Sequence, residues 1–309
     1  MNTFESKSKK TLLIEKLIKF FLILAATISI LTTFGILFSI LFESIEFFKL
    51  RSFWYFLTGT VWSPGVIGSK FGALPIFAGT FVITIIALSV AIPIGLGSAV
   101  YMSEYASPKL RDYLKPLLEI LAGIPTVVYG FFAAITVAPL IVKMADAVGL
   151  EATFNSALAS GVVMGIMIIP VISSLSDDVI RAVPDSQRKA AFGLGMTHGE
   201  IIKNIVLPSA LPGIISASLL GLSKALGETM IVVMAAGLRP NLSWNPLEDM
   251  TTVTVTIVNS LVGDFEFNSP ETLSAFALGL VLFVITLILN MISLSLIRKF
   301  KEKYKVNTL

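Results

Sequence analysis

Two residues of opposite charge, Lys224 and Glu228, lie in the middle of residues 213–238, which carry no other charged side chain. In a helix, a spacing of four residues places both side chains on one face, where they can pair. Each charge at the centre of a bilayer costs about 2.5–3.5 kcal/mol, so its presence needs a reason. The pair either fixes the packing of this helix against a neighbour, or it lines a path in which the Lys224 ammonium replaces the lost water of an anion.

The other polar residues near the membrane are weaker candidates for such a path. The hydroxyl groups of Thr126 and Tyr129 could hydrogen-bond an oxyanion. Buried threonine and tyrosine residues nevertheless serve more often as simple contacts between helices. Glu104, Asp177 and Asp178 are interpreted as solvated charges at the membrane surface.

The composition excludes several classes of protein. Of the 309 residues, 55% are hydrophobic and only 14% are charged, which argues against both a soluble enzyme and a disordered chain. There is no cysteine and only one histidine, His198, so a thiolate nucleophile and a Cys- or His-based metal site are ruled out. We therefore expect no catalytic residue, no metal and no cofactor. The chain also lacks a G-x-x-x-x-G-K-[ST] phosphate loop, so any ATP hydrolysis is expected on a separate subunit.

Long charge-free windows locate the membrane spans, because a helix needs about 20 apolar residues to cross a bilayer. The sequence predicts an all-α integral membrane protein with six transmembrane helices, at 20–42, 75–101, 120–142, 152–176, 204–223 (continued by 229–238) and 272–297. A further window, 250–263, is too short to cross and is interpreted as an interfacial or re-entrant helix.

The positive-inside rule orients these spans. Most of the 23 basic residues lie in the two tails and in the second and fourth loops, so both termini are predicted to be cytoplasmic. The predicted parts are a basic tail (1–19), a first transmembrane helix (20–42), an external segment (43–72), a core of five transmembrane helices (73–297) and a second tail (298–309). The core contains a cytoplasmic loop (177–212) and a second external segment (238–270).

The cytoplasmic loop 177–212 begins with signals for a short helix. Pro184 should end the helix that leaves the fourth span. Asp185 should then cap a new helix over 186–192.

The same loop contains a second short helix. After a glycine bend at Gly195, Thr197 and Glu200 match a capping box for a helix over 198–207, and Pro208 and Pro212 should mark the turn into the fifth span. Two short capped helices with a bend between them fit either a connector lying on the lipid surface or a docking element for a cytoplasmic partner.

The spacing Ala190-Ala191-x3-Gly195-x9-Ile205-x-Leu207-Pro208 resembles the "EAA" loop of ABC-importer permeases. This resemblance implies that the loop, chiefly 185–207, sits in a cleft on an ATP-hydrolysing subunit and transmits its motion. The implied docking residues are Lys189, Ala190, Ala191, Gly195, Ile205, Leu207 and Pro208. At Lys189 the family has glutamate, so an acidic contact is not expected there.

Three further stretches are similar to permeases of the phosphate-specific (Pst) type, PstC-like subunit: FGALPIFAGT at 71–80, GIPTVVYGF at 123–131 and GLSKALGETM at 221–230. The resemblance implies a type I ABC-importer permease fold in a prokaryotic cytoplasmic (inner) membrane. It implies transport of inorganic phosphate by alternating access, with Lys224, Glu228, Thr126 and Tyr129 along the pathway.

The partners implied by the resemblance are a second homologous permease subunit, an ATPase dimer, an external phosphate-binding protein and membrane lipid, with no nucleic acid. Two alternatives remain open. The substrate could be another oxyanion such as sulfate or molybdate, or the chain could be a secondary anion transporter that works without ATP.

Overall fold

The computed structural model describes residues 9–65, 68–262, 266 and 268–303. Parts of both predicted tails, 1–8 and 304–309, lie outside the described residues, as do 66–67, 263–265 and 267. The elements in chain order, with η for a π turn, are α1 (Lys9–Leu50), α2 (Phe53–Thr58), β1 (Trp62–Ser63), β2 (Lys70–Phe71), α3 (Leu74–Val100), η1 (Tyr101–Tyr105), α4 (Pro108–Ala122), α5 (Thr126–Phe132), η2 (Ala133–Val137), α6 (Ala138–Ala147), α7 (Ala157–Arg181), α8 (Asp185–Gly193), α9 (His198–Ile201), η3 (Ile202–Val206), α10 (Leu207–Leu226), α11 (Met230–Ala235), α12 (Val253–Val262) and α13 (Pro270–Lys303).

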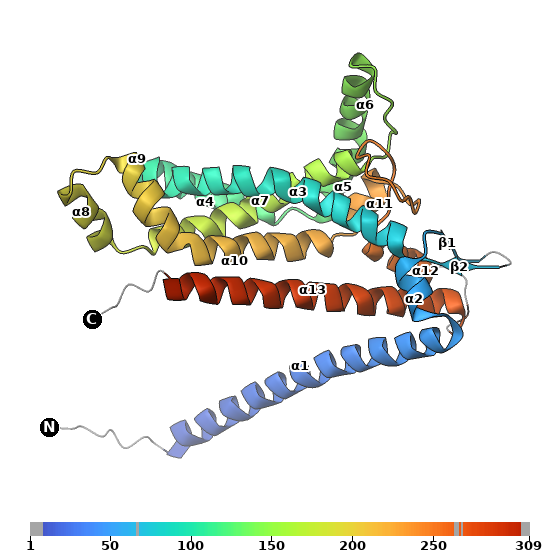
Figure 1. Cartoon of the computed structure of the whole chain (residues 1–309). Coiled ribbons are helices and arrows are strands. Elements are labelled where there is room, and N and C mark those ends of the chain that lie inside the picture. Colours follow the sequence, from blue (N-terminus) through green and yellow to red (C-terminus); the bar gives the residue numbers. More distant parts are fainter. Residues whose placement is uncertain (1–8, 66–67, 263–265, 267, 304–309) are drawn as a thin grey trace.

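Six stretches of helix within the described residues are long and apolar enough to cross a membrane, as predicted. They are Ile14–Leu50, Leu74–Tyr105, Thr126–Ala147, Ala157–Arg181, His198–Leu226 and Pro270–Lys299. The helices α3, α7, α10 and α13 run side by side, and α8 and α9 lie at one end of this bundle (Figure 1). The start of α1 and the end of α13 lie at that same end, which is consistent with termini on one side of the membrane.

The centre of the bundle is the contact between α3 and α7. Ile83 of α3 is 1% exposed, and Ile168 and Ile172 of α7 are completely buried. This tightly packed contact forms the core on which the other helices are placed.

Helix α1 stands apart from this core. The most apolar window of Ile14–Leu50 has no buried residue, and α1 diverges from α13 toward the end that carries α8 (Figure 1). A helix that is apolar on all sides and exposed in the single chain requires lipid or another membrane helix around it.

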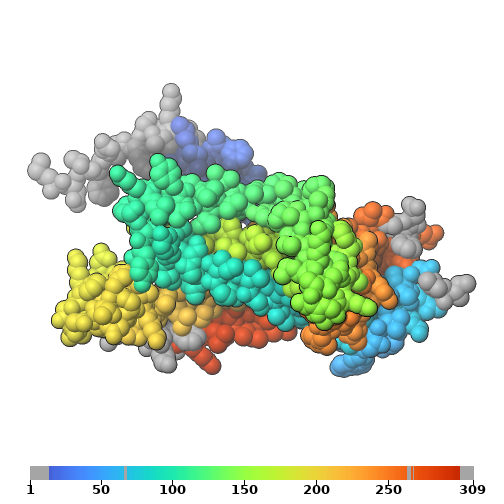
Figure 2. Space-filling model, turned by 90° about the horizontal axis from the view of Figure 1, so that it is seen from above, coloured from blue at the N-terminus to red at the C-terminus, as the bar shows by residue number. Residues whose placement is uncertain are grey.

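The third predicted span, 120–142, is wrong as a single straight helix. Helix α4 ends at Ala122, Pro125 precedes the first residue of α5, and the chain changes direction between them. Helix α4 follows the bundle, whereas α6 stands upright on it in Figure 1 and is seen end-on in Figure 2. The break coincides with Pro125, which lacks an N–H group and disfavours the helical conformation at the residue before it.

The turn predicted at Pro208 and Pro212 is also wrong, because helix runs without interruption from His198 to Leu226. A π turn, η3, ends at Val206, two residues before Pro208. The wider turn provides room for a proline ring and tolerates its missing N–H, so the chain can keep its direction.

The opposite end of the bundle is closed by an aromatic cluster. The ring centroid of Phe47 lies 5.4 Å from that of Phe56 and 5.5 Å from that of Phe71, and Trp62 lies 5.6 Å from Phe71. Edge-to-face contacts at such distances are favourable. They fix the short hairpin β1–β2 to the end of α1.

The short helix predicted within 250–263 is confirmed as α12. Its first residue, Val253, is completely buried, and the Val253 N–H donates to the Thr80 hydroxyl of α3 at 3.0 Å. This segment therefore folds back onto the bundle core.

Candidate functional site

A helix break lies between the two charges predicted to form a pair. Helix α10 ends at Leu226, Gly227 follows, and the short helix α11 begins at Met230. The Glu228 side chain, 7% exposed, lies in this break. Its Oε1 accepts hydrogen bonds from the N–H groups of Thr229 (3.1 Å), Met230 (2.9 Å) and Ile231 (3.4 Å). Glu228 thus satisfies the free N–H groups at the start of α11, where a negative charge is favoured.

The predicted ion pair between Lys224 and Glu228 is not formed. The helix ends between the two residues, so the geometry of one helical turn is lost, and the carboxylate is turned toward α11. Lys224 is half-buried in the last turn of α10. Among the ion pairs of the described residues, none includes Lys224. Its ammonium group is consequently available to an anion or to a neighbouring subunit, since an unpaired charge within the membrane requires such a partner.

The capping role gives Glu228 a testable effect on stability. Glu228→Ala is expected to lower the free energy of unfolding by about 0.5–2 kcal/mol, the usual cost of losing an N-terminal cap. Glu228→Gln keeps an acceptor oxygen and should cost less. Thermal unfolding of the purified variants in detergent checks this order, and equal midpoints for wild type and Glu228→Ala would contradict the capping role.

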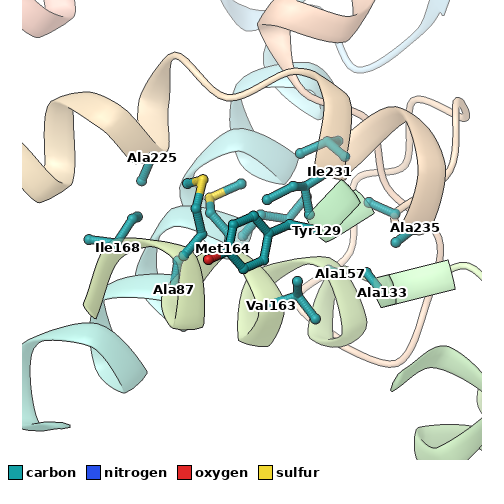
Figure 3. Close-up of a cluster of buried hydrophobic side chains, with 14 of the residues drawn as sticks. Ala87, Tyr129, Ala133, Ala157, Val163, Met164, Ile168, Ala225, Ile231 and Ala235 are labelled. Atoms are coloured by element: carbon teal, nitrogen blue, oxygen red, sulfur yellow. The ribbon is translucent and has the colours of Figure 1, made fainter. Parts of the chain in front are cut away.

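A second helix break holds the other two predicted pathway residues. Thr126 is the first residue of α5 and is half-buried. Tyr129 is 9% exposed, and its hydroxyl donates across the break to the Leu121 carbonyl at 2.9 Å. Figure 3 shows the Tyr129 ring in the middle of the buried cluster, beside Met164 of α7 and Ile231 of α11.

The two breaks lie close together because α5 packs directly on α11. A Cβ atom placed on Gly130 would lie 2.8 Å from Met234 Sδ and 3.0 Å from the Met230 carbonyl oxygen, so only glycine allows this approach. Discontinuous helices of this kind supply substrate and ion sites in many membrane transporters. The four predicted pathway residues therefore all lie at two neighbouring breaks, although no described hydrogen bond or ion pair joins Lys224 to Thr126 or Tyr129.

The two short helices of the loop are formed largely as predicted; we call residues 185–207 the docking loop. Gly195 has φ +82°, the left-handed conformation that suits glycine, and it forms the bend. The capping box is confirmed: Thr197 Oγ1 accepts from the Glu200 N–H, and Glu200 Oε2 accepts from the Thr197 N–H at 2.8 Å. The prediction for Asp185 is wrong, since Pro184 occupies the cap position and Asp185 is the first helical residue.

The docking loop and the start of α10 line an open groove of about 360 Å³, which we call the docking groove. It is lined by Gln187, Ala190, Ala191, Leu194, Met196, Asn204, Ile205, Pro208 and Ser209. Four of the predicted docking residues, Ala190, Ala191, Ile205 and Pro208, are among them, whereas Lys189, Gly195 and Leu207 do not line it. The Leu194 side chain is 84% exposed beside the groove.

The sequence alone missed several lining residues. Gln187 lies one helical turn before Ala190 and Ala191 on the same face of α8, and Leu194, the C-cap residue, continues this spacing. This periodicity is the signal that could have predicted both residues.

The charges predicted to be solvated are mostly not. The Asp177 side chain is completely buried, and its Oδ2 lies 2.7 Å from Nη2 of Arg111. Glu104 is 6% exposed and lies 2.9 Å from Arg188. Asp178 is 52% exposed and pairs with Lys115. The prediction is wrong for the first two because their partners lie far away in the sequence.

Residues 91–303 match the protein family described as "Binding-protein-dependent transport system inner membrane component". The chain belongs to this family. It is 34% identical over 251 residues to the "Probable ABC transporter permease protein YqgH" of Bacillus subtilis, covering 81% of this chain and 78% of that protein.

Relatives that are named as phosphate transport permeases have similar sequence identities to this chain. The "Phosphate transport system permease protein PstC" of Mesorhizobium japonicum is 36% identical over 252 residues, covering 76% of this chain and 75% of that protein. The PstC of Haemophilus influenzae is 32% identical over 307 residues, covering 94% of this chain and 95% of that protein. The predicted resemblance to permeases of this type is confirmed.

Solved structures agree on the fold. The chain resembles a bacterial ABC transporter involved in the import of alginate with a TM-score of 0.63, at 15% identity, over 93% of this chain and 98% of that one. It also resembles the MetNI methionine ABC transporter in an inward-facing conformation, with a TM-score of 0.56 at 16% identity, over 72% of this chain and 93% of that one. The type I ABC-importer permease fold is confirmed.

Proposed function

We propose that this chain is the transmembrane permease subunit of an ATP-driven importer of inorganic phosphate. The observation that carries the proposal is the similarity to phosphate transport permeases over most of the chain. The docking groove supports the same function, because a small exposed groove at the end of a membrane bundle suits an ATPase subunit.

In this proposal, energy enters through the docking loop. An ATPase dimer binds ATP on the cytoplasmic side and closes, the docking loop moves with it, and the bundle alternates between inward and outward openings. Helix α8 is short and lies between Pro184 and the bend at Gly195, so it can move as a rigid element, whereas α9 continues into α10 and moves with it.

The pathway in this proposal runs along the two helix breaks. The Lys224 ammonium stabilises phosphate that has lost part of its water, as a single point charge. Glu228 holds the break open by capping α11. Thr126 supplies a hydroxyl group at the neighbouring break, and Tyr129 supports that break through its hydrogen bond to the Leu121 carbonyl.

The proposed assembly contains a second, homologous permease subunit, which covers part of the exposed apolar surface. It further contains the ATPase dimer and an external phosphate-binding protein, in the cytoplasmic (inner) membrane of a prokaryote, surrounded by lipid.

Co-purification tests the proposal. The tagged chain, expressed with the neighbouring transport subunits of its source, should retain an ATPase subunit in detergent, and the reconstituted complex should take up labelled phosphate. Unlabelled phosphate should compete, whereas sulfate and molybdate should not. Stronger competition by sulfate or molybdate would identify a different oxyanion as the substrate. Uptake by the chain alone without ATP would show that the chain is a secondary transporter.

A further inference from the structure

The end of α3 differs from an ordinary helix end. The π turn η1 closes α3, and the N–H of Ala106 donates to the Tyr101 carbonyl to complete it. Within this turn the Glu104 side chain is 6% exposed. Single π turns of this kind occur often at functional positions.

Arg188 of the docking loop binds Glu104 and the end of α7 together. Its Nη2 lies 2.9 Å from Glu104 Oε1 and 3.0 Å from the Ile180 carbonyl oxygen, and its Nη1 donates to the Val183 carbonyl. The Arg188 side chain is itself only 16% exposed. One guanidinium group therefore connects α8, the end of α7 and the end of α3, which suits the planar, five-donor geometry of arginine.

The other helix of the docking loop contacts the same turn. His198, at the start of α9, places Nε2 3.2 Å from the Glu104 carbonyl oxygen, and its ring lies 5.2 Å from the Tyr105 ring. The carbonyl can only accept, so Nε2 carries the proton in this contact. Both helices of the docking loop thus hold the residues Glu104 and Tyr105.

The contact continues to α4 through the end of α7. Arg111 pairs with the buried Asp177, and the hydrogen bond to Asp177 raises the pKa of Arg111 above its ordinary value. Lys115 pairs with Asp178 one position further along. Since α4 leads directly into the break before Thr126, a displacement of these charges reaches the proposed pathway.

We propose that Arg188 and Glu104 are positioning residues that couple the docking loop to the membrane helices, so that movement of the loop moves α3 and the pathway breaks. This inference rests on the proposed function. Arg188 Nη1 also lies 3.4 Å from Oδ1 of the exposed Asp185, but that contact stays within α8, whereas the buried contact with Glu104 joins α8 to the end of α3. Removing the Glu104 carboxylate therefore loses the charge contact between these two elements, which otherwise opposes their sliding. At its other end the loop is joined to the bundle directly, because α9 continues into α10. Without the contact between Arg188 and Glu104, α8 could move against the end of α3 through the short turn at 182–184.

The test compares uptake with ATP hydrolysis in the reconstituted complex. Glu104→Ala is expected to reduce the phosphate transported per ATP hydrolysed by about tenfold, within the usual range for coupling between sites. Glu104→Gln should give an intermediate loss, and Glu104→Asp, which keeps the charge, should recover most of the coupling. Co-purification of the ATPase subunit and its rate of ATP hydrolysis should stay within about twofold of wild type.

Arg181→Gln is the matched control, because Arg181 ends α7 and is exposed. It should leave the transport-to-hydrolysis ratio unchanged. If Glu104→Ala fails to accumulate, Glu104→Gln carries the test. Proportional loss of uptake and hydrolysis in the Glu104 variants, or a wild-type ratio in all of them, would overturn the inference. Failure of ATP-dependent uptake in the wild-type complex would instead contradict the proposed function.

Discussion

Lys224→Met is expected to reduce phosphate uptake by about tenfold to a hundredfold, which corresponds to the 1.5–3 kcal/mol of a hydrogen bond to a charged group. Methionine is unbranched, matches the apolar stem of lysine in length and lacks the ammonium group. This substitution should not leave Glu228 without a partner, because the Glu228 carboxylate accepts hydrogen bonds from N–H groups at the start of α11. Its effect on uptake therefore reports on the Lys224 charge alone. Initial rates of labelled phosphate uptake in proteoliposomes provide the measurement.

Two controls accompany this variant. Lys224→Arg keeps a positive charge and should retain most of the uptake. Lys70→Met removes a positive charge from an exposed strand residue outside the proposed path and should have no effect. If Lys224→Met transports normally, Lys224 lies outside the pathway, and if it prevents assembly of the complex, Lys224 serves a subunit contact instead.

Ala190→Trp is expected to disconnect the chain from its ATPase subunit. Ala190 lines the docking groove and is exposed, so the indole ring would occupy the groove without disturbing the buried core. Loss of a central contact in an interface costs about 2–4 kcal/mol, so the amount of co-purified ATPase subunit should fall at least about thirtyfold. ATP-dependent uptake should fall with it.

Lys203→Trp is the matched control for this change. Lys203 belongs to the docking loop and is exposed, but it does not line the groove. The same bulk at this position should leave both co-purification and uptake near wild type. Equal losses from both variants would show a general effect of bulk on the loop, and no loss from Ala190→Trp would exclude the groove as the docking site.

Local signals in the sequence predicted much of the fold. Gly195, Thr197 and Glu200 lie within six consecutive residues, so their bend and capping box could be recognised without any tertiary information. The membrane spans were equally accessible, because a bilayer requires long apolar windows regardless of packing.

The break at Gly227 could not be predicted in the same way. A spacing of four residues has the same sequence pattern whether the helix is continuous or ends between the two residues. A single glycine is also tolerated within membrane helices, so Gly227 does not by itself predict a break. The role of Glu228 follows only from the break, since its three N–H partners become free when α11 starts anew. The π turn before Pro208 was likewise invisible to a rule that expects proline to end a helix.

The charge contacts of the coupling site required the tertiary structure. Glu104 and Arg188 are 84 positions apart, and Arg111 and Asp177 are 66 apart. In sequence, each of these residues is an ordinary charge beside a membrane span. Only the packing of α4 and the docking loop on α7 turns them into buried pairs.

The most direct measurement is uptake of labelled phosphate into proteoliposomes that contain this chain with its partner permease, ATPase and binding protein. ATP or a non-hydrolysable analogue is supplied on the side of the docking loop. The account predicts uptake with ATP, little with the analogue, and little when the ATPase subunit is omitted. Equal uptake with ATP, with the analogue and without the ATPase subunit would contradict it.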